Sequence, residues 1–349
     1  MILSCPILLL IVSTNYYFDP AYIFHHDIED KMIKIILNGQ NVTNCTDFDE
    51  RSLVSKIPKA IDKAPNILVL GSSRINYIRQ EYFNNKTLIN ANVSSASLMD
   101  IVINYQFFKH YNRLPDEKII IGIDPWFFNN NNPEYRWKRY KSVFQDFIDG
   151  EIGLTYKLQE NPISYYFQLA SLSYFQSSLK SAQRNVIELI PTDLKYNKGM
   201  TVMSDFSKVG SKLSRDATLD EVREKANNYF SMHGVRINTF NEISIELTNL
   251  FENLINDIIK NNIDVELLII PYHPKVYEIV ESDFPNIIKT ENILNDLANK
   301  HKVSIFGSFN PSEIEFDETD FLDGLHCTEN AIKKLTQRTT QHTTKPKLH

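Results

Sequence analysis

The chain has 349 residues, of which 42% are hydrophobic and 23% are charged, a composition typical of a globular protein rather than a disordered one. Its length allows one large domain with an insertion, or two domains. The formal net charge of −6 offers no general basic surface for nucleic acid, so we expect no nucleic-acid partner.

An apolar segment opens the chain. Residues 2–12 are mostly aliphatic and are interrupted by Ser4, Cys5 and Pro6. This run is shorter than the roughly 20 residues that a spanning helix needs, and no basic residue precedes it. A signal segment or shortened anchor is one interpretation, and a buried N-terminal strand is the alternative. We expect residues 1–25 to form a signal or anchor segment of a membrane-associated, extracytoplasmic protein, and residues 26–349 to form one domain.

Five short apolar runs predict the strands of one buried, mainly parallel sheet. They are residues 67–70, 88–91, 119–123, 265–270 and 303–306. Helical segments alternate with them at 97–111 and 243–258, and Thr328 can cap a final helix. The alternation predicts a three-layer α/β/α sandwich. Residues from about 126 to 240 depart from this pattern, and we expect them to form a mostly helical insertion.

Two short motifs supply the candidate chemistry. Residues 71–74 (Gly-Ser-Ser-Arg) follow the first predicted strand, and residues 323–326 (Asp-Gly-Leu-His) precede the final helix. α/β folds place their chemistry at the strand ends. A serine hydroxyl needs a base within hydrogen-bond reach, and a nearby carboxylate can orient that base. We therefore predict Ser73 as nucleophile, His326 as general base and Asp323 as the orienting acid.

These motifs resemble those of the SGNH (GDSL-like) hydrolase superfamily, especially its extracytoplasmic branch associated with acylation of cell-surface polysaccharides. The resemblance covers about residues 60–125 and 263–338. That family carries its nucleophile after the first strand and its acid and base in an Asp-x-x-His block near the C-terminus, which implies the same roles for Ser73, Asp323 and His326. Ser72 replaces the aspartate of the family's first block.

Two further family blocks match less well. In the family's second block, the backbone N–H of a glycine binds the oxyanion, and Ser95 stands in the place of that glycine here. The backbone N–H of Ser95 can still bind the oxyanion if serine can adopt the backbone conformation that the glycine has. In the third block the family has an Asn, whereas Asp124 follows the central strand here. An ionised aspartate cannot donate a hydrogen bond. Either Asn129 or the Trp126 indole donates instead, or the oxyanion hole is incomplete.

The resemblance implies a serine esterase or O-acyltransferase that acts on acyl esters, most simply acetyl esters, of cell-surface carbohydrate and uses no metal or organic cofactor. Arg74, Asp124 and Trp126 are the expected substrate-binding residues, although for Arg74 a salt-bridged surface arginine is the alternative. The alternative function is a catalytically weakened carbohydrate-binding accessory protein with a membrane acyltransferase as its partner. The residues at the oxyanion positions favour that alternative.

Three other features leave alternatives open. Cys45 and Cys327 form a disulfide in an oxidising compartment or remain free thiols, and the cysteine spacing indicates no metal site. The basic run at 136–141 is interpreted as a solvated helix face or, less simply, as a local patch for an anionic ligand. His273 follows a predicted strand, and we interpret it as a structural histidine rather than one that lines the site.

Overall fold

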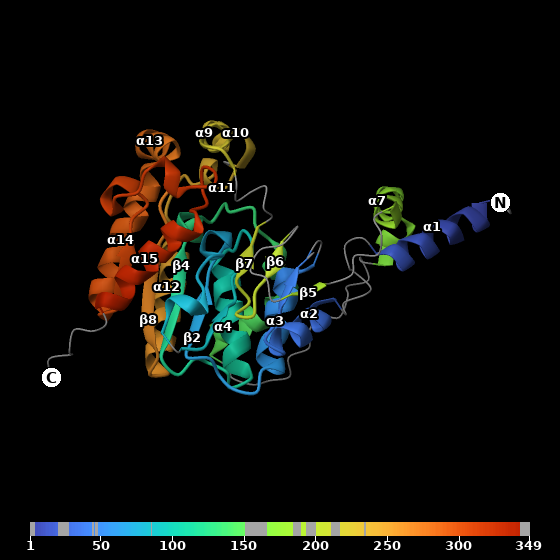
Figure 1. Cartoon of the computed structure of the whole chain (residues 1–349), viewed down its shortest axis with the longest axis horizontal. Helices are drawn as coiled ribbons and strands as arrows, with labels where there is room; N and C mark the ends of the chain where they lie inside the picture. Colours follow the sequence, from blue (N-terminus) through green and yellow to red (C-terminus); the bar gives the residue numbers. More distant parts are fainter. Residues whose placement is uncertain are drawn as a thin grey trace.

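The computed structural model describes residues 4–19, 28–43, 45, 48–84, 86–150, 166–183, 190–192, 200–210, 217–233 and 235–342. Its main body is built around a five-stranded parallel sheet with helices on both faces (Figure 1). The predicted α/β/α sandwich is therefore confirmed.

The parallel sheet has the strand order β3-β2-β4-β8-β9. Its members are β2 (Ile67–Leu70), β3 (Leu88–Asn90), β4 (Lys118–Ile123), β8 (Asp264–Ile269) and β9 (Ser304–Gly307). Each observed strand matches a predicted run to within one residue at either end. The chain goes outward from β2 to β3 and then crosses to β4 on the other side, so the strand order reverses between β2 and β4. In such sheets the crevice for ligands lies beyond the carboxyl ends of the strands at this switch point.

Two hydrophobic cores cover the two faces of the sheet. Successive side chains of a strand point to opposite faces, and in β2 Leu68 and Leu70 join one core while Ile67 and Val69 join the other. The first core contains side chains of α3 (Glu50–Ala60), α4 (Leu98–His110), α12 (Ile245–Lys260), α13 (Pro274–Asp283) and α14 (Pro285–His301).

The final helix, α15 (Glu329–His342), covers the second core. The Thr328 hydroxyl accepts a hydrogen bond from the Ala331 N–H at 3.3 Å, as the sequence predicts for a capping residue. Ala331, Ile332 and Leu335 are buried on its inner face. The helix thus fixes the end of the segment that carries His326.

The insertion between β4 and α12 is helical, but it also contributes strands to a second sheet. Its helices are η3 (Pro125–Phe128), η4 (Arg136–Tyr140), α5 (Lys141–Asp149), η5 (Phe167–Ala170), α7 (Leu172–Gln183), α9 (Leu219–Asn227), α10 (Tyr229–His233) and α11 (Val235–Asn238). This second sheet is antiparallel and has the order β5-β1-β6-β7. The insertion contributes β5 (Ile190–Thr192), β6 (Thr201–Val202) and β7 (Lys208–Val209). The remaining strand, β1 (Asn41–Thr43), follows α2 (Ile28–Leu37). Strands of two or three residues are too short to show an alternating pattern, so the sequence did not predict them. Residues 151–165 of the insertion lie outside the described residues.

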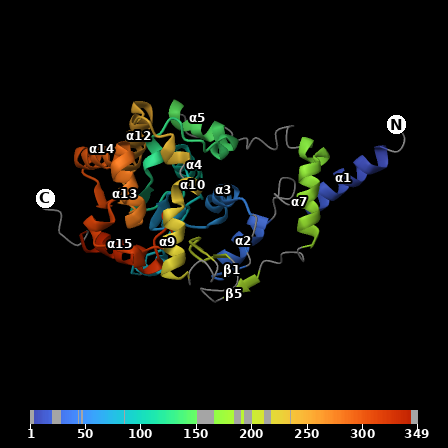
Figure 2. The same ribbon diagram turned by 90° about the horizontal axis from the view of Figure 1, so that it is seen from above.

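Helix α1 (Ser4–Phe18) lies apart from the sandwich and packs against α7 of the insertion (Figures 1 and 2). The Asn15 amide donates hydrogen bonds to the carbonyls of Leu169 and Ser171 at 2.8 and 3.1 Å, and it accepts one from the Ser178 hydroxyl at 3.0 Å. The interpretation as a buried N-terminal strand is therefore wrong for this segment. Among the described helices, none is both long enough and apolar enough to cross a bilayer.

Candidate active site

The Ser73 side chain is presented at the carboxyl end of β2. The 3-10 helix η1 (Ser73–Ile75) begins two residues after Gly71, and the Ser72 hydroxyl accepts a hydrogen bond from the Arg74 N–H at 3.3 Å. Ile75 packs onto two glycines at adjacent strand ends, Gly71 and Gly122, where any Cβ would overlap its side chain. The two glycines therefore let η1 lie close against the sheet at the switch point.

The loop that carries His326 is organised by Asp323. One carboxylate oxygen accepts the backbone N–H groups of Leu325 and His326 at 2.7 and 2.8 Å. The other oxygen lies 2.9 Å from His326 Nδ1. Between them, Gly324 approaches Val276 and Tyr229 so closely that a Cβ would meet both side chains. The carboxylate thus fixes the loop and the imidazole ring together.

The structure brings Ser73, His326 and Asp323 into one hydrogen-bonded series. Ser73 Oγ lies 2.9 Å from His326 Nε2, although the two residues are 253 positions apart in the chain. An ionised carboxylate can only accept hydrogen bonds, so Nδ1 of His326 carries the proton that faces Asp323. Nε2 is then free to accept the proton of the Ser73 hydroxyl. Both Ser73 and His326 are half-buried, which leaves the pair accessible from solvent.

The charges of this pair shift the pKa values of both groups in opposite directions. Burial by itself lowers the pKa of His326, but the adjacent Asp323 carboxylate outweighs it and raises the pKa above the ordinary 6.5. Burial also opposes ionisation of Asp323, yet His326 and the two backbone N–H donors hold the pKa of this carboxyl below its ordinary value. Asp323 is therefore ionised at neutral pH.

Arg74 and Asp124 form a buried ion pair, which corrects their expected role in binding substrate. Arg74 Nη1 donates to an Asp124 oxygen at 3.2 Å, and both side chains are almost fully buried. The same guanidinium donates to the carbonyls of Ile270, Pro271 and Leu325. Burial raises the pKa of Asp124, and the Arg74 charge opposes that shift. Arg74 therefore ties the strand ends and the His326 loop together, as the salt-bridge alternative implies, although the pair is buried.

The structure also rules out Trp126 and Asn129 as oxyanion donors. The Trp126 indole N–H donates to the Ala96 carbonyl at 2.9 Å, and its side chain is buried, so it also offers no surface to a substrate. The Asn129 side-chain amide donates to the Arg236 carbonyl and the Thr239 hydroxyl, and its backbone N–H donates to the Trp126 carbonyl. All of these donors are already occupied.

Ser95 keeps the backbone conformation that a glycine would adopt. Its φ is +57°, in the left-handed region that favours glycine but that other residues reach at a modest energetic cost. The loop lies beside the nucleophile turn, because the Val93 N–H donates to the Gly71 carbonyl at 3.1 Å. Within the described part of the chain, the N–H groups of Ser73 and Ser95 have no acceptor, so both remain free as hydrogen-bond donors.

The sequence interpretation missed a set of charged side chains behind this loop. Arg136 of the basic run is exposed to solvent, as one interpretation of that run expects, and it also donates to the Ser94 carbonyl at 3.1 Å. The buried Lys208 ammonium donates to the Asn92 carbonyl at 2.6 Å. The backbone carbonyls that these groups bind have no signature in the sequence, so nothing in the motifs could have pointed to them.

The two cysteines and the histidine that the sequence analysis considered are all buried. Cys45 and Cys327 are buried free thiols, and burial raises the pKa of both, so neither is a reactive thiolate. His273 is fully buried, and its Nδ1 accepts the Lys275 N–H at 3.1 Å at the start of α13. Its backbone N–H donates to the Gly324 carbonyl, so it supports the His326 loop.

Comparison with known proteins adds no family assignment. No protein-family model matches this chain, and no curated protein matches it. The resemblance to SGNH hydrolases therefore depends on the sequence motifs alone.

Proposed function

We propose that this protein is a serine esterase or O-acyltransferase of the SGNH type that acts on acyl esters, most simply acetyl esters, of cell-surface carbohydrate. The observation that carries the proposal is the Ser73–His326–Asp323 series, with 2.9 Å contacts on both sides of the imidazole. Its position at the switch point of a parallel sheet is where α/β folds bind ligands. The carbohydrate substrate comes from the family resemblance.

In the proposed reaction, Ser73 Oγ attacks the ester carbonyl carbon while its proton passes to His326 Nε2. Asp323 stabilises the imidazolium that forms. The N–H groups of Ser73 and Ser95 bind the oxyanion. The tetrahedral intermediate then breaks its bond to the alcohol oxygen, which takes the proton from His326 and leaves an acyl group on Ser73. Water or a sugar hydroxyl attacks this acyl-enzyme, gives its proton to His326, and releases the product as the proton returns to Ser73.

A fluorophosphonate probe tests the nucleophile directly, because it bonds covalently only to an activated serine. We expect labelling of the wild-type protein and loss of labelling in Ser73→Ala and His326→Ala. Ser72→Ala is the matched control, since Ser72 is adjacent but buried, and its hydroxyl caps η1 and contacts Asp124. Folded wild-type protein that takes up no probe, or Ser73→Ala that labels as well as wild type, contradicts the proposal.

One observation favours a second candidate, a catalytically weakened carbohydrate-binding protein that serves a membrane acyltransferase. Asp124 stands where the family has an Asn, and its carboxylate forms an ion pair with Arg74. The oxyanion hole therefore has backbone donors without the usual side-chain donor. Losing one such donor typically costs about 2.7–4 kcal/mol of transition-state stabilisation. Glycan binding by a folded protein that does not label would support this second function.

The proposal also includes extracytoplasmic membrane association through α1. Ile7, Leu8, Leu9 and Leu10 are consecutive and all exposed, so this turn of α1 is apolar on every side rather than along one stripe. The exposed rings of Tyr16 and Tyr17 follow, and such rings favour the membrane–water interface. These features support contact of the N-terminal half of α1 with lipid, while its C-terminal half packs against α7.

A further inference from the structure

The loop at residues 92–96 is held by side chains from four different elements. These side chains leave its backbone little freedom, because most of its polar groups have fixed partners. The contacts run from Lys208 Nζ of β7 to the Asn92 carbonyl (2.6 Å), from the Ser94 N–H to Glu50 of α3, from Arg136 of η4 to the Ser94 carbonyl (3.1 Å), and from the Trp126 indole of η3 to the Ala96 carbonyl (2.9 Å).

Arg136 acts on the particular peptide unit that matters for the proposed reaction. The Ser94 carbonyl and the Ser95 N–H belong to the same peptide bond. In a trans peptide the C=O and N–H point in opposite directions. The Arg136 guanidinium therefore binds one end of this peptide dipole while the free N–H lies at the other end. A cation at the carbonyl oxygen polarises the peptide and strengthens its N–H as a donor.

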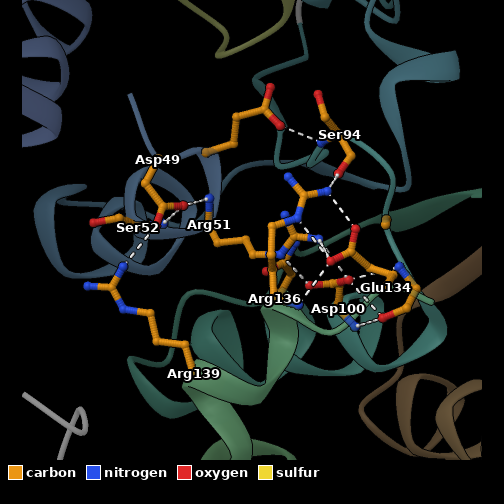
Figure 3. Close-up of polar contacts among 12 residues, drawn as sticks. Asp49, Arg51, Ser52, Ser94, Asp100, Glu134, Arg136 and Arg139 are labelled. Carbon is orange, nitrogen blue, oxygen red and sulfur yellow. Dashed lines mark hydrogen bonds and ion pairs between the residues drawn. The ribbon is translucent and has the colours of Figure 1, made fainter. Parts of the chain in front are cut away.

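The Arg136 side chain is itself held in place by a series of buried charges (Figure 3). Glu134 accepts from Arg136 Nε at 2.9 Å and from Nη2 at 2.5 Å. Arg51 lies 3.7 Å from the same Glu134 carboxylate and makes two hydrogen bonds to Asp100 at 2.7 and 3.1 Å. Asp100 in turn accepts the backbone N–H of Ser97, the N-cap of α4, which is the helix that follows the loop. Although 49% of the Arg136 side chain is exposed, its two hydrogen bonds to the buried Glu134 carboxylate hold the guanidinium toward the loop.

We propose that Arg136 is a positioning residue for the oxyanion: by binding the Ser94 carbonyl, it fixes and polarises the peptide whose Ser95 N–H stabilises the transition state. This inference rests on the proposed function. It gives the insertion a part in the reaction, because η4 lies outside the two segments that carry the motifs. It also offers a partial substitute for the side-chain donor that is lost at Asp124.

The test compares Arg136→Gln with Arg139→Gln. Arg139 is the matched control, because it lies in the same 3-10 helix but donates to Asp49 at 2.8 Å, away from the loop (Figure 3). We expect Arg136→Gln to fold, since Glu134 keeps Arg51 and Arg236 as neighbouring cations. Arg136→Lys restores the charge with fewer donors, and its activity should lie between those of wild type and Arg136→Gln.

Hydrolysis of p-nitrophenyl acetate and inhibition by phenylboronic acid are the readouts. Boronic acids add to the active serine and place an oxygen in the oxyanion hole. For Arg136→Gln we expect kcat to fall about 10- to 100-fold, less than the ~10²–10³-fold typical of a deleted donor, and KM to stay within about twofold because the effect is confined to the transition state. The inhibition constant of the boronic acid should rise by the same factor as kcat falls, whereas Arg139→Gln should change neither.

The outcomes separate this inference from the proposed function. If wild-type protein shows hydrolysis that Ser73→Ala abolishes, but Arg136→Gln equals Arg139→Gln in kcat and in boronic acid inhibition, the positioning role is wrong and the esterase proposal stands. A rise in KM with kcat unchanged would likewise overturn it, since that is the result of lost ground-state binding. If wild type shows no Ser73-dependent hydrolysis, both proposals fail.

Discussion

Replacing Arg74 with methionine should destabilise the folded state by about 3–5 kcal/mol, the cost typical of removing one partner of a buried ion pair. Methionine fills much of the same volume but offers no donor. Asp124 is then left buried without its cation, and the carbonyls of Ile270, Pro271 and Leu325 lose their hydrogen bonds. The packing of the guanidinium over the Tyr272 ring, 4.6 Å from its centroid, is lost as well.

Equilibrium unfolding in urea measures this effect, with the slope against urea expected to stay the same because the surface exposed on unfolding hardly changes. The double variant Arg74→Met/Asp124→Leu is the decisive comparison. Replacing a buried ion pair with apolar residues is often neutral in stability, so we expect it to recover at least about 2 kcal/mol relative to Arg74→Met. A loss below about 1 kcal/mol in Arg74→Met, or no recovery in the double variant, would refute the reasoning.

The same pair of variants separates stability from site geometry. Arg74 Nε donates to the Leu325 carbonyl, one residue before His326, and apolar side chains cannot replace that contact. We therefore expect fluorophosphonate labelling to remain slow in the double variant even where its stability has returned. Labelling at the wild-type rate would show that the His326 loop is held without Arg74.

The remaining predictions concern pH, packing and membrane contact. The kcat/KM for p-nitrophenyl acetate should rise with pH to half of its plateau above pH 6.5, because Asp323 raises the pKa of His326 above that value and only the neutral imidazole accepts the serine proton; a lower midpoint contradicts the pairing. By the same shifts, the pair stabilises the fold fully between about pH 4 and pH 6.5. This contribution is lost as the pH rises through the raised pKa of His326 or falls through the lowered pKa of Asp323, which urea unfolding at several pH values measures. Gly122→Ala should cost about 1–3 kcal/mol because its methyl group overlaps Ile75, and adding Ile75→Ala should relieve the overlap; unchanged stability in urea would contradict the close packing. Leu9→Glu should weaken flotation with phospholipid vesicles, whereas Ile245→Glu, at a side chain of the same size on α12 that is even more exposed, should not; equal flotation of both variants argues against contact through α1.

The parallel sheet could be predicted from the sequence because strands buried on both faces are continuous apolar runs. The run at 119–123, for example, has no charged residue and lies in the middle of the observed sheet. The proximity of Ser73 and His326 could also be predicted, since Ser73 follows a strand end, where α/β folds place their chemistry, and a serine there needs a base such as His326 within hydrogen-bond reach. Their 2.9 Å contact agrees with the geometry expected of the two motifs.

The places of the other candidate residues could not be predicted, because their partners are backbone atoms of distant segments. Arg74 looks like a residue for binding an anionic substrate until the Ile270 and Pro271 carbonyls are seen beside it. Asn129 looks like a free donor until the Arg236 carbonyl is found to occupy its amide. A carbonyl oxygen is present at every residue, so no sequence pattern marks the few that meet a particular side chain.

The distribution of buried charge offers a final argument about the site. Removing charged side chains from water is expensive, and a buried ion pair is rarely the most stable way to fill a core. Yet Arg74, Lys208 and Arg51 are all buried at one edge of the sheet, and each has an acidic partner. Arg74 donates to the Leu325 carbonyl beside His326, and Lys208 donates to the Asn92 carbonyl in the loop that carries Ser95. Groups that hold a reactive constellation must be rigid to within a fraction of an ångström. Under the proposed function, this edge therefore carries charged groups because they fix the positions of Ser73, His326 and the Ser95 N–H, whereas stability alone would favour apolar side chains there.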